Sequence, residues 1–301
     1  MQDYKTILHS ISLIQNSNGL AYFVGGAVRD FFLDILDNNF DIVNIESIKL
    51  SDFVLYLVNN NKDIDIATSI YPDKIYEIFT NNGFFVKTTL VTNIAVKNKT
   101  KLEITTLRKD VNPDGRWTQT EFAKTIQEDS SRRDFTVNAI YIEPIIDTNS
   151  VVIHDFYNGI DDLKNKHIRF INNPYQRIRE DYLRMLRFFR FSCRFSQSFD
   201  KDAVNACQDI YQEYINARNK NEKGVVLLAK ERIKDEIIKI LSDKNYKMFL
   251  KILITPQFAT AFCQRDTKDI IKSVNLLFIS DFIINYNRNV SIFYENLCNY
   301  K

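Results

Sequence analysis

The sequence predicts an α+β protein in which a small mixed sheet occupies the N-terminal part and an all-helical part follows. Short β-branched and aromatic runs, which are typical of strands, alternate with helix-like segments in the first 143 residues. After residue 200, apolar residues recur at helical spacing. Seven glycines and five prolines in 301 residues are few, which favours long elements joined by short loops.

The elements of the N-terminal part follow from residue spacing and from turn signals. Ile7, Ile11 and Ile14 predict an amphipathic helix over 4–18. Pro72 stands where a helix over 73–80 can begin. The remaining expected elements are one helix over 27–36 and strands over 21–24, 62–67, 84–87, 93–97 and 102–106.

The composition predicts a soluble globular protein, because 45% of the residues are hydrophobic and 26% are charged. No apolar run is long enough to span a membrane. The four cysteines lack paired spacing, which predicts free thiols in a reducing compartment; they are Cys193, Cys207, Cys263 and Cys298. A cytoplasmic location is expected, and no protein partner is implied. Residues 164–194 hold nine Lys or Arg against two acids in a chain of net charge +2, which favours a local phosphate-binding face.

Two aspartates on one predicted strand are the first candidate site. Asp63 and Asp65 are two residues apart, so their side chains share one face of the strand. Like charges at that distance repel, and a divalent cation that binds both removes the repulsion. Carboxylate oxygens suit Mg²⁺. Upstream, Gly25 and Gly26 form a turn between a strand and a helix, where backbone approaches a phosphate closely. Metal-binding carboxylates beside such a turn are typical of phosphoryl or nucleotidyl transfer.

These motifs resemble the class II tRNA nucleotidyltransferases (the CCA-adding enzymes) and the related bacterial poly(A) polymerases. The matching stretches are Val24–Asp30 and Asp63–Pro72. The resemblance implies a nucleotidyltransferase-fold head and template-independent addition of CCA, from CTP and ATP, to the tRNA 3′ end. It also implies two Mg²⁺ ions on Asp63 and Asp65. Gly25, Gly26 and Arg29 would then belong to the nucleotide-binding site.

The chain departs from the family between these two stretches. The family spacing places the carboxylate pair near Asp41, where this chain has only one carboxylate. Residues 40–60 resemble a degraded copy of 64–82. Residues 41–60 are therefore predicted to be an inserted strand and helix at the edge of the head, without nucleotide contacts. Asp63 and Asp65 are favoured as metal ligands because two carboxylates are present, and Asp41 remains the alternative.

Further matches follow along the chain. Glu103 lies in a string similar to the family's, where it would join the two aspartates in catalysis. Residues 108–127 are polar and predict a mobile loop around Asp114, Gly115 and Arg116, which in the family is linked to the switch from adding C to adding A. The family also uses a sugar- and phosphate-binding motif that matches here at Arg132, Arg133, Asp134 and Asn138.

A helix is predicted over 179–191 by its spacing. Asp181 and Arg184 would then share a face, and the family motif implies that they hydrogen-bond the incoming base in place of a template. The resemblance also implies phosphate binding or positioning by Arg187. A later segment, Lys230–Glu236, resembles a motif that supports this helix.

The sequence therefore predicts a catalytic head over 1–143, a helical neck over 144–243 and a short helical body over 244–301. The closest alternative function is a poly(A) polymerase or an A-adding enzyme of the same family. The region after Phe79 lacks a Gly-Arg-Arg/Lys-Phe string typical of that branch, which favours tRNA as the substrate. A non-catalytic RNA-binding relative is the third hypothesis, which the intact motifs disfavour.

Overall fold

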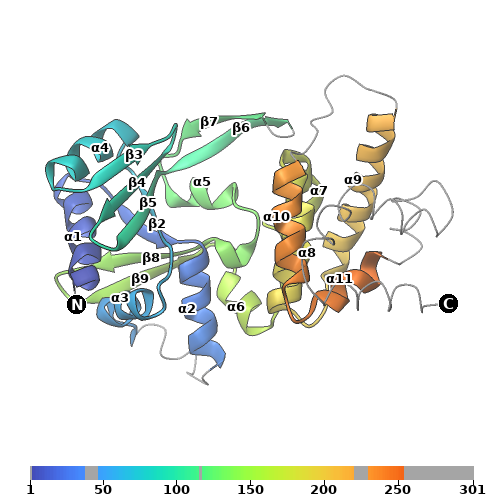
Figure 1. The fold of residues 1–301 in the computed structure, drawn as a ribbon, viewed down its shortest axis with the longest axis horizontal. Helices are drawn as coiled ribbons and strands as arrows, with labels where there is room; N and C mark the ends of the chain where they lie inside the picture. The colour runs from blue at the N-terminus through green and yellow to red at the C-terminus, as the bar shows by residue number, and fades with distance from the viewer. Residues whose placement is uncertain (1, 38–46, 115–116, 220–229, 254–301) are drawn as a thin grey trace.

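The computed structural model describes residues 2–37, 47–114, 117–219 and 230–253. A sheet of seven strands forms the N-terminal part, in the order β3-β4-β5-β2-β1-β8-β9. The helices α7 to α11 gather beside this sheet and form a separate, all-helical part (Figure 1). The α+β class with a mixed N-terminal sheet is confirmed.

The strands are close to those predicted, and the structure adds several. The bounds are β1 Ala21–Val24, β2 Ile64–Thr68, β3 Phe85–Thr88, β4 Thr92–Lys97, β5 Thr100–Thr106, β6 Arg108–Asp114, β7 Trp117–Phe122, β8 Ile140–Ile145 and β9 Ser150–Asp155. The helices are α1 Gln2–Asn16, α2 Gly26–Asp37, α3 Leu50–Asn59, α4 Pro72–Asn81, α5 Ile126–Ser131, α6 Gly159–Lys164, α7 Pro174–Glu180, α8 Leu183–Phe195, α9 Lys201–Asn219, α10 Lys230–Leu241 and α11 Tyr246–Leu253.

Strand β2 lies near the centre of the sheet, where it pairs parallel with β5 and antiparallel with β1. Its side chains alternate between two apolar clusters on opposite faces of the sheet. Ile64 and Ile66 join the large core, whereas Ala67 joins a small cluster that includes Tyr22 and Tyr141. Asp65 has the parity of Ala67, so its carboxylate lies on the face with the smaller cluster.

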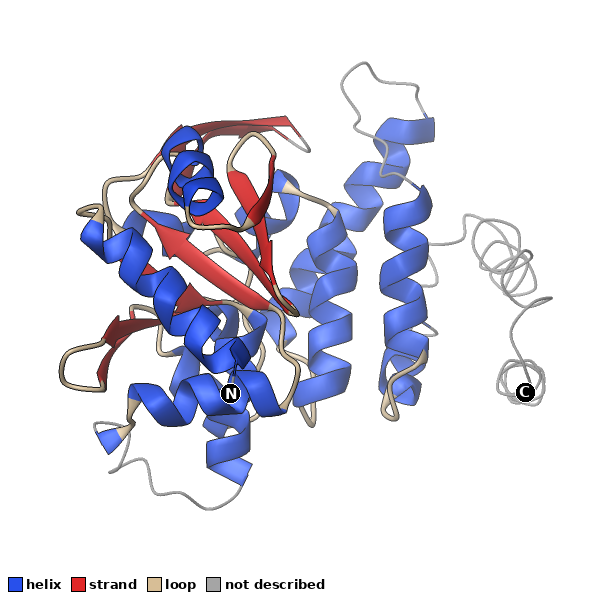
Figure 2. Cartoon of the chain, turned by 60° about the vertical axis from the view of Figure 1, so that its left-hand side comes forward, coloured by secondary structure: helices blue, strands red, loops and turns tan. Residues whose placement is uncertain are grey.

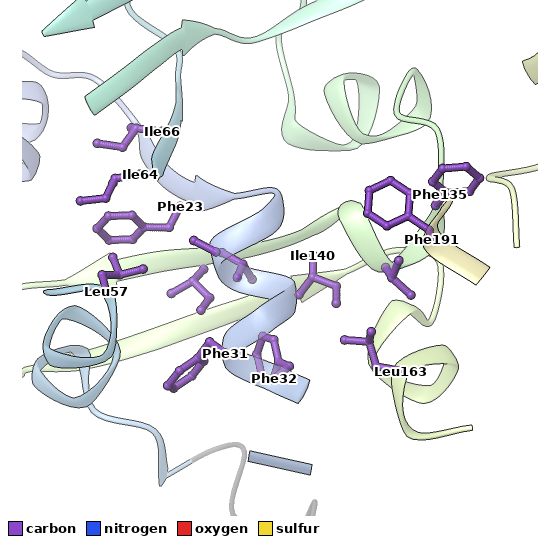
Figure 3. Close-up of a cluster of buried hydrophobic side chains, with 14 of the residues drawn as sticks. Phe23, Phe31, Phe32, Leu57, Ile64, Ile66, Phe135, Ile140, Leu163 and Phe191 are labelled. Atoms are coloured by element: carbon purple, nitrogen blue, oxygen red, sulfur yellow. The ribbon is translucent and has the colours of Figure 1, made fainter. Parts of the chain in front are cut away.

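The large core is one continuous cluster of buried side chains. It begins around Phe23 and Ile64 under the sheet, passes the aromatic side chains of α2, and reaches Phe135 and Phe191 at the neck (Figure 3). Figure 2 shows helices of the N-terminal part beside the sheet, and the all-helical part next to them. Head and neck are therefore joined by apolar packing and by the polar contacts described below.

The predicted insertion is only partly described, because Asp41 lies outside the described residues. Its helix, α3, buries Leu50, Phe53 and Leu57 in the large core. The Phe53 ring packs edge-on against Phe23 of the central strand β1, at 5.1 Å between ring centroids. The prediction that the inserted helix lies at the edge of the head was wrong: it packs under the sheet, because its apolar face matches the core.

A large-to-small change in α3 tests this packing. We expect Phe53→Ala to lower the free energy of unfolding by about 3–5 kcal/mol, since the ring is fully buried and leaves a cavity. Leu55→Ala on the same helix is the control, because Leu55 is 46% exposed and should cost less than about 1 kcal/mol. Urea denaturation measures both, and equal costs would contradict a core role for α3.

The polar segment 108–127 is not one mobile loop, which corrects the prediction. Most of it forms an antiparallel ribbon of β6 and β7, and α5 begins at its end. The pairing shifts register between Val111 and Asp114, and Pro113 lies at that irregularity, where a missing backbone donor is tolerated. The polar side chains and the proline of this segment are typical of a loop, so its strands were not predicted from the sequence. Asp114 is the last residue of β6, and Gly115 and Arg116 lie outside the described residues.

The predicted boundary between head and neck at residues 143 and 144 falls inside β8. Strands β8 and β9 continue the sheet, so the head extends at least to Asp155. Within the body, only α11 belongs to the described residues. No helix among the described residues is long and apolar enough to cross a membrane.

Candidate active site

Two carboxylates face each other across neighbouring strands at the centre of the sheet. Asp65 on β2 is the register partner of Glu103 on β5, and parallel partners point to the same face. Asp63 lies immediately before β2 and is exposed. The structure thus brings together all three residues predicted to carry the catalysis.

The turn after β1 approaches this carboxylate pair through a glycine. Gly25 has a φ of +84°, a left-handed conformation that glycine adopts without strain. A Cβ atom at this position would lie 2.9 Å from Oδ2 of Asp65. Gly26 begins α2, and a Cβ there would meet no atom closer than 3.6 Å. Gly25 is therefore the glycine that the geometry requires.

The charges around Asp65 fit a cation. Burial, followed by Glu103 and Asp63, raises the pKa of Asp65 to about 6, against opposing effects of Arg133 and Lys101. Carboxylate oxygens suit Mg²⁺. In this structure, however, no three His, Cys, Asp or Glu side chains among the described residues are arranged to bind a metal together. Asp63 and Asp65 as the two ligands remain a prediction.

The raised pKa of Asp65 predicts a pH-dependent stability of the metal-free protein. The unfolded chain releases this proton near pH 3.8 and the folded chain near pH 6, so stability falls as pH rises through that window. Above it, the full cost is about 3 kcal/mol at most. We expect Asp65→Asn to raise the free energy of unfolding in EDTA by up to about 3 kcal/mol near pH 8, and by little near pH 4, as measured by urea denaturation.

The control for this experiment is Asp52→Asn, which removes an exposed carboxylate from α3 and should change stability by less than about 0.5 kcal/mol at either pH. A gain from Asp65→Asn that is the same at both pH values would contradict the assignment of the effect to ionisation of Asp65.

A lysine from the same strand contacts Glu103. Lys101 is two residues away on β5, so it shares the face of Glu103, and its Nζ lies 2.6 Å from Oε1. Both side chains are about half exposed. The sequence motifs gave no sign of Lys101, since isolated lysines on strands are common.

The paired arginines are held by one buried carboxylate, Asp129. Its Oδ1 accepts from Nε and Nη2 of Arg132, at 2.9 and 2.7 Å. Its Oδ2 accepts from Nη2 of Arg133 at 3.0 Å and from the Tyr141 hydroxyl at 2.6 Å. Burial opposes ionisation, but Arg133 and Arg132 outweigh it and lower the pKa of Asp129. Of the cations that favour ionised Asp65, Arg133 has the larger effect, so the charge of the arginine motif reaches the carboxylates.

A chain of hydrogen bonds runs from α2 to the neck helix α8. Arg29 donates to Asp30 and, through Nη1, to Oδ1 of Asn138 at 2.8 Å. Asn138 donates to Oδ1 of Asp134 at 3.0 Å, and Arg187 donates from Nε to Oδ2 of Asp134 at 2.7 Å. Burial opposes ionisation of Asp134, but Arg187 outweighs it and lowers the pKa to about 2.

In this structure these polar side chains of the predicted nucleotide site form hydrogen bonds with one another. The Arg29 guanidinium is buried, and it lies 5.0 and 4.6 Å from the ring centroids of Phe191 and Phe195 on α8. Nucleotide binding by Arg29, Asp134, Asn138 and Arg187 stays a prediction, beside the observed role of joining head to neck.

The predicted helix over 179–191 is interrupted, which corrects the geometry of the base-recognition pair. α7 ends at Glu180 and α8 begins at Leu183, while Asp181 is extended with a φ of −153°. The Asp181 carboxylate accepts from the backbone N–H of Leu183, the first residue of α8, at 3.0 Å. It therefore does not share a helix face with Arg184 by spacing. The hydrogen-bonding potential of the aspartate for its own downstream backbone competes with a continuous helix.

The Arg184 guanidinium forms its hydrogen bonds with groups other than the Asp181 carboxylate. Its Nη1 donates to Oε2 of Glu180 at 2.6 Å, and its Nη2 donates to the carbonyl of Arg132 at 3.1 Å. The second bond connects the neck with the head at the arginine motif. Arg184 and Arg132 thus lie side by side, which supports one continuous site.

Helix α10 supports α8 as the resemblance implied. Nη2 of Arg232 lies 2.9 Å from Oδ2 of Asp181, and Oε2 of Glu236 accepts from Nε of Arg190 at 2.6 Å. The expected free basic face over 164–194, however, is largely paired: eight of its nine cations form ion pairs with Asp or Glu. Glu180, inside the segment, pairs with two of these cations, but most of the other acids come from distant segments, which the local count of charges could not reveal.

The sequence motifs missed the residues that hold the site together. Asp129, Tyr141 and Glu180 are all buried and bind the arginines of the predicted site. Asp129 and Glu180 stand next to the arginine and base-recognition motifs, and an acid beside an arginine cluster was the one available signal. Tyr141 had none, because β8 was not predicted.

The comparisons with known proteins agree with this arrangement. Residues 52–169 match the family model of the poly(A) polymerase head domain. The human mitochondrial CCA tRNA nucleotidyltransferase 1 is 37% identical over 200 residues, which are 64% of this chain and 42% of the relative. The CCA-adding enzyme of Ligilactobacillus salivarius is 30% identical over 292 residues, which are 94% of this chain and 60% of the relative. The chain thus spans about half the length of these curated relatives.

Solved structures show the same fold. A crystal structure of the Bacillus stearothermophilus CCA-adding enzyme in complex with CTP has a TM-score of 0.62 at 25% identity and covers 86% of this chain and 53% of its own. A tRNA nucleotidyltransferase complexed with a primer tRNA and an incoming ATP analog has a TM-score of 0.60 at 19% identity, covering 96% and 74%. In motifs, fold and sequence, this chain is therefore similar to the CCA-adding tRNA nucleotidyltransferases and to the poly(A) polymerase head domain.

Proposed function

We propose that this protein adds CCA to the 3′ end of tRNA, using CTP and ATP without a nucleic-acid template. The observation that carries the proposal is the pairing of Asp65 with Glu103 beside Gly25, with Arg133 next to them. The relatives named CCA tRNA nucleotidyltransferase and CCA-adding enzyme support the choice of reaction. The proposed location is cytoplasmic, as expected from the sequence.

The proposed reaction joins the RNA 3′-hydroxyl to the α-phosphorus of the nucleotide. The 3′ oxygen forms the new bond as the bond to the leaving pyrophosphate breaks, and the hydroxyl proton is lost. Two Mg²⁺ ions, when bound, would activate the hydroxyl and stabilise the charge on the phosphates. Asp63 and Asp65 would hold these ions, and Glu103 adds a third carboxylate to the same face. Gly25 leaves room for the phosphates by having no side chain, and Arg132 and Arg133 offer forked donors to them.

Base selection is proposed for Asp181 and Arg184, at the junction of α7 and α8. Each already has protein partners, Arg232 for Asp181 and Glu180 for Arg184. A base would therefore meet groups whose positions are fixed beforehand, which favours discrimination by hydrogen bonding. The connection from Arg184 to the Arg132 carbonyl places base selection next to phosphate binding.

A poly(A) polymerase or A-adding activity is the second candidate, because the matching head model is that of poly(A) polymerases. The two activities share a head and differ in the accepted RNA and nucleotides.

The decisive experiment offers the purified chain four labelled nucleotides separately, with Mg²⁺, on tRNA that lacks CCA, ends in C or ends in CC. CCA addition predicts CTP incorporation on the first two RNAs and ATP incorporation on the third. Incorporation of ATP alone, on any of the RNAs, would support the second candidate, and no incorporation with any pair would reject both.

A further inference from the structure

We propose that Arg108 is a further nucleotide-binding residue, whose guanidinium binds the triphosphate of the incoming nucleotide beside Arg132 and Arg133. This inference rests on the proposed function and adds a residue to the same site. Arg108 is the first residue of β6, directly after β5, the strand that carries Glu103.

The carboxylate of Asp129 is already occupied by donors other than the side chain of Arg108. A carboxylate offers about four lone-pair positions. Besides the donors from Arg132, Arg133 and Tyr141, Oδ1 of Asp129 accepts from the backbone N–H of Arg108 at 3.1 Å. The acceptor capacity of Asp129 is thus used up, and the side chain of Arg108 finds no room on it. The guanidinium groups of Arg132 and Arg133, which occupy this carboxylate, also act electrostatically on the side chain of Arg108.

The side chain of Arg108 carries a buried hydrogen-bond donor that lacks an acceptor in the described part of the chain. Nε of Arg108 is buried and has no hydrogen-bond partner among the described residues. Burial, and then the charge of Arg132, lowers the pKa of Arg108, and the opposing charges of Asp110 and Asp129 do not fully offset this effect. A buried donor without an acceptor costs free energy, and an anion would supply both the acceptor and the negative charge.

The backbone of Arg108 has a fixed position beside Asp129 and Arg132. The backbone of Arg108 is fixed on both sides, because its N–H binds Asp129 and its carbonyl accepts from Nε of Arg132 at 3.1 Å. From there the arginines continue to Arg133, whose charge acts on Asp65. A triphosphate held near Asp65 therefore extends towards the arginines. The side chains of Arg132 and Arg133 are only 14% and 18% exposed, which favours a small phosphate chain over an RNA backbone.

The test measures binding without catalysis, by titrating the full chain with inorganic tripolyphosphate and with CTP in a calorimeter. We expect Arg108→Met to weaken both about 10- to 100-fold, since it removes a charge-assisted contact. Arg108→Lys keeps the charge but loses Nε and the fork, so it should weaken both at least about fivefold. Because it is the milder change, it also serves if Arg108→Met does not fold.

The matched control is Lys109→Met. It removes one positive charge from the next residue of β6, which points to the other face and pairs with Glu121. We expect less than a twofold change in either affinity. Equal losses in the Arg108 and Lys109 variants would overturn the proposal, because net charge would then explain them.

Further outcomes separate this inference from the proposed function. Unchanged tripolyphosphate and CTP affinity in both Arg108 variants would overturn the inference and leave CCA addition standing. Tight binding of CTP that depends on Arg108, in a protein that incorporates no nucleotide into tRNA, would uphold the inference and reject the proposed function. Weaker binding of tRNA, but not of tripolyphosphate, by Arg108→Met would assign the residue to the RNA and overturn the inference.

Discussion

Replacing Asp65 by asparagine is expected to lower nucleotide incorporation about a thousandfold or more, while the protein stays folded. The carboxylate is central in the sheet, opposite Glu103 and beside Gly25, where its negative charge would hold a divalent cation more tightly than a neutral amide oxygen. Asparagine keeps the shape of the side chain and removes its charge. The measurement is steady-state incorporation of labelled CTP into tRNA that lacks CCA, with urea denaturation of the same preparation.

Asp63→Asn should have a similarly large effect, since the two aspartates are predicted to share the metal. Asp41→Asn tests the alternative register of the motif. Full activity in Asp65→Asn with loss of activity in Asp41→Asn would show that the assignment of the metal ligands to Asp63 and Asp65 is wrong. Mg²⁺ should raise the unfolding temperature of the unmodified chain but not of Asp65→Asn, which gives a readout besides activity.

The catalytic part of the fold was predictable because short motifs and strand periodicity agree there. Asp63 and Asp65 are two residues apart in the sequence, so the strand repeat alone predicted a shared face, and β2 begins directly after Asp63. Glu103 needed the extra step of placing two strands side by side, which the parallel pairing of β2 and β5 confirms. These elements are set by local apolar alternation, the strongest signal that a sequence carries.

The errors arose where long-range contacts outweigh local pattern. The polar ribbon of β6 and β7 has the composition of a loop, and the backbone pairing that makes it a ribbon does not depend on side-chain polarity. The break at Asp181 has a local cause instead, because the Asp181 carboxylate accepts from the backbone N–H of Leu183 within an otherwise helical spacing. The acids that neutralise the neck, such as Asp134 and Glu236, come from segments 53 and 46 residues away from their arginines. No local charge count contains them.

The second large effect is expected in nucleotide selection by Arg184→Ala. Uracil differs from cytosine by exchanging a donor for an acceptor, so a fixed arginine beside a fixed carboxylate leaves uracil with unpaired groups. Each unpaired buried group costs about 1–3 kcal/mol, so the preference for CTP over UTP should fall about 10- to 100-fold. The measurement is the ratio of incorporation rates for the two nucleotides on tRNA that lacks CCA.

Arg184 also has a structural part, which the control must separate from base selection. It holds the Arg132 carbonyl and the buried Glu180, so its removal should lower all rates in addition to changing their ratio. Glu180→Gln weakens the same anchoring but leaves the Arg184 guanidinium in place, so it should lower all rates with little change in the CTP to UTP ratio. If Arg184→Ala and Glu180→Gln lower all four nucleotides equally, Arg184 only positions the neck against the head, and the discrimination of bases belongs to other residues.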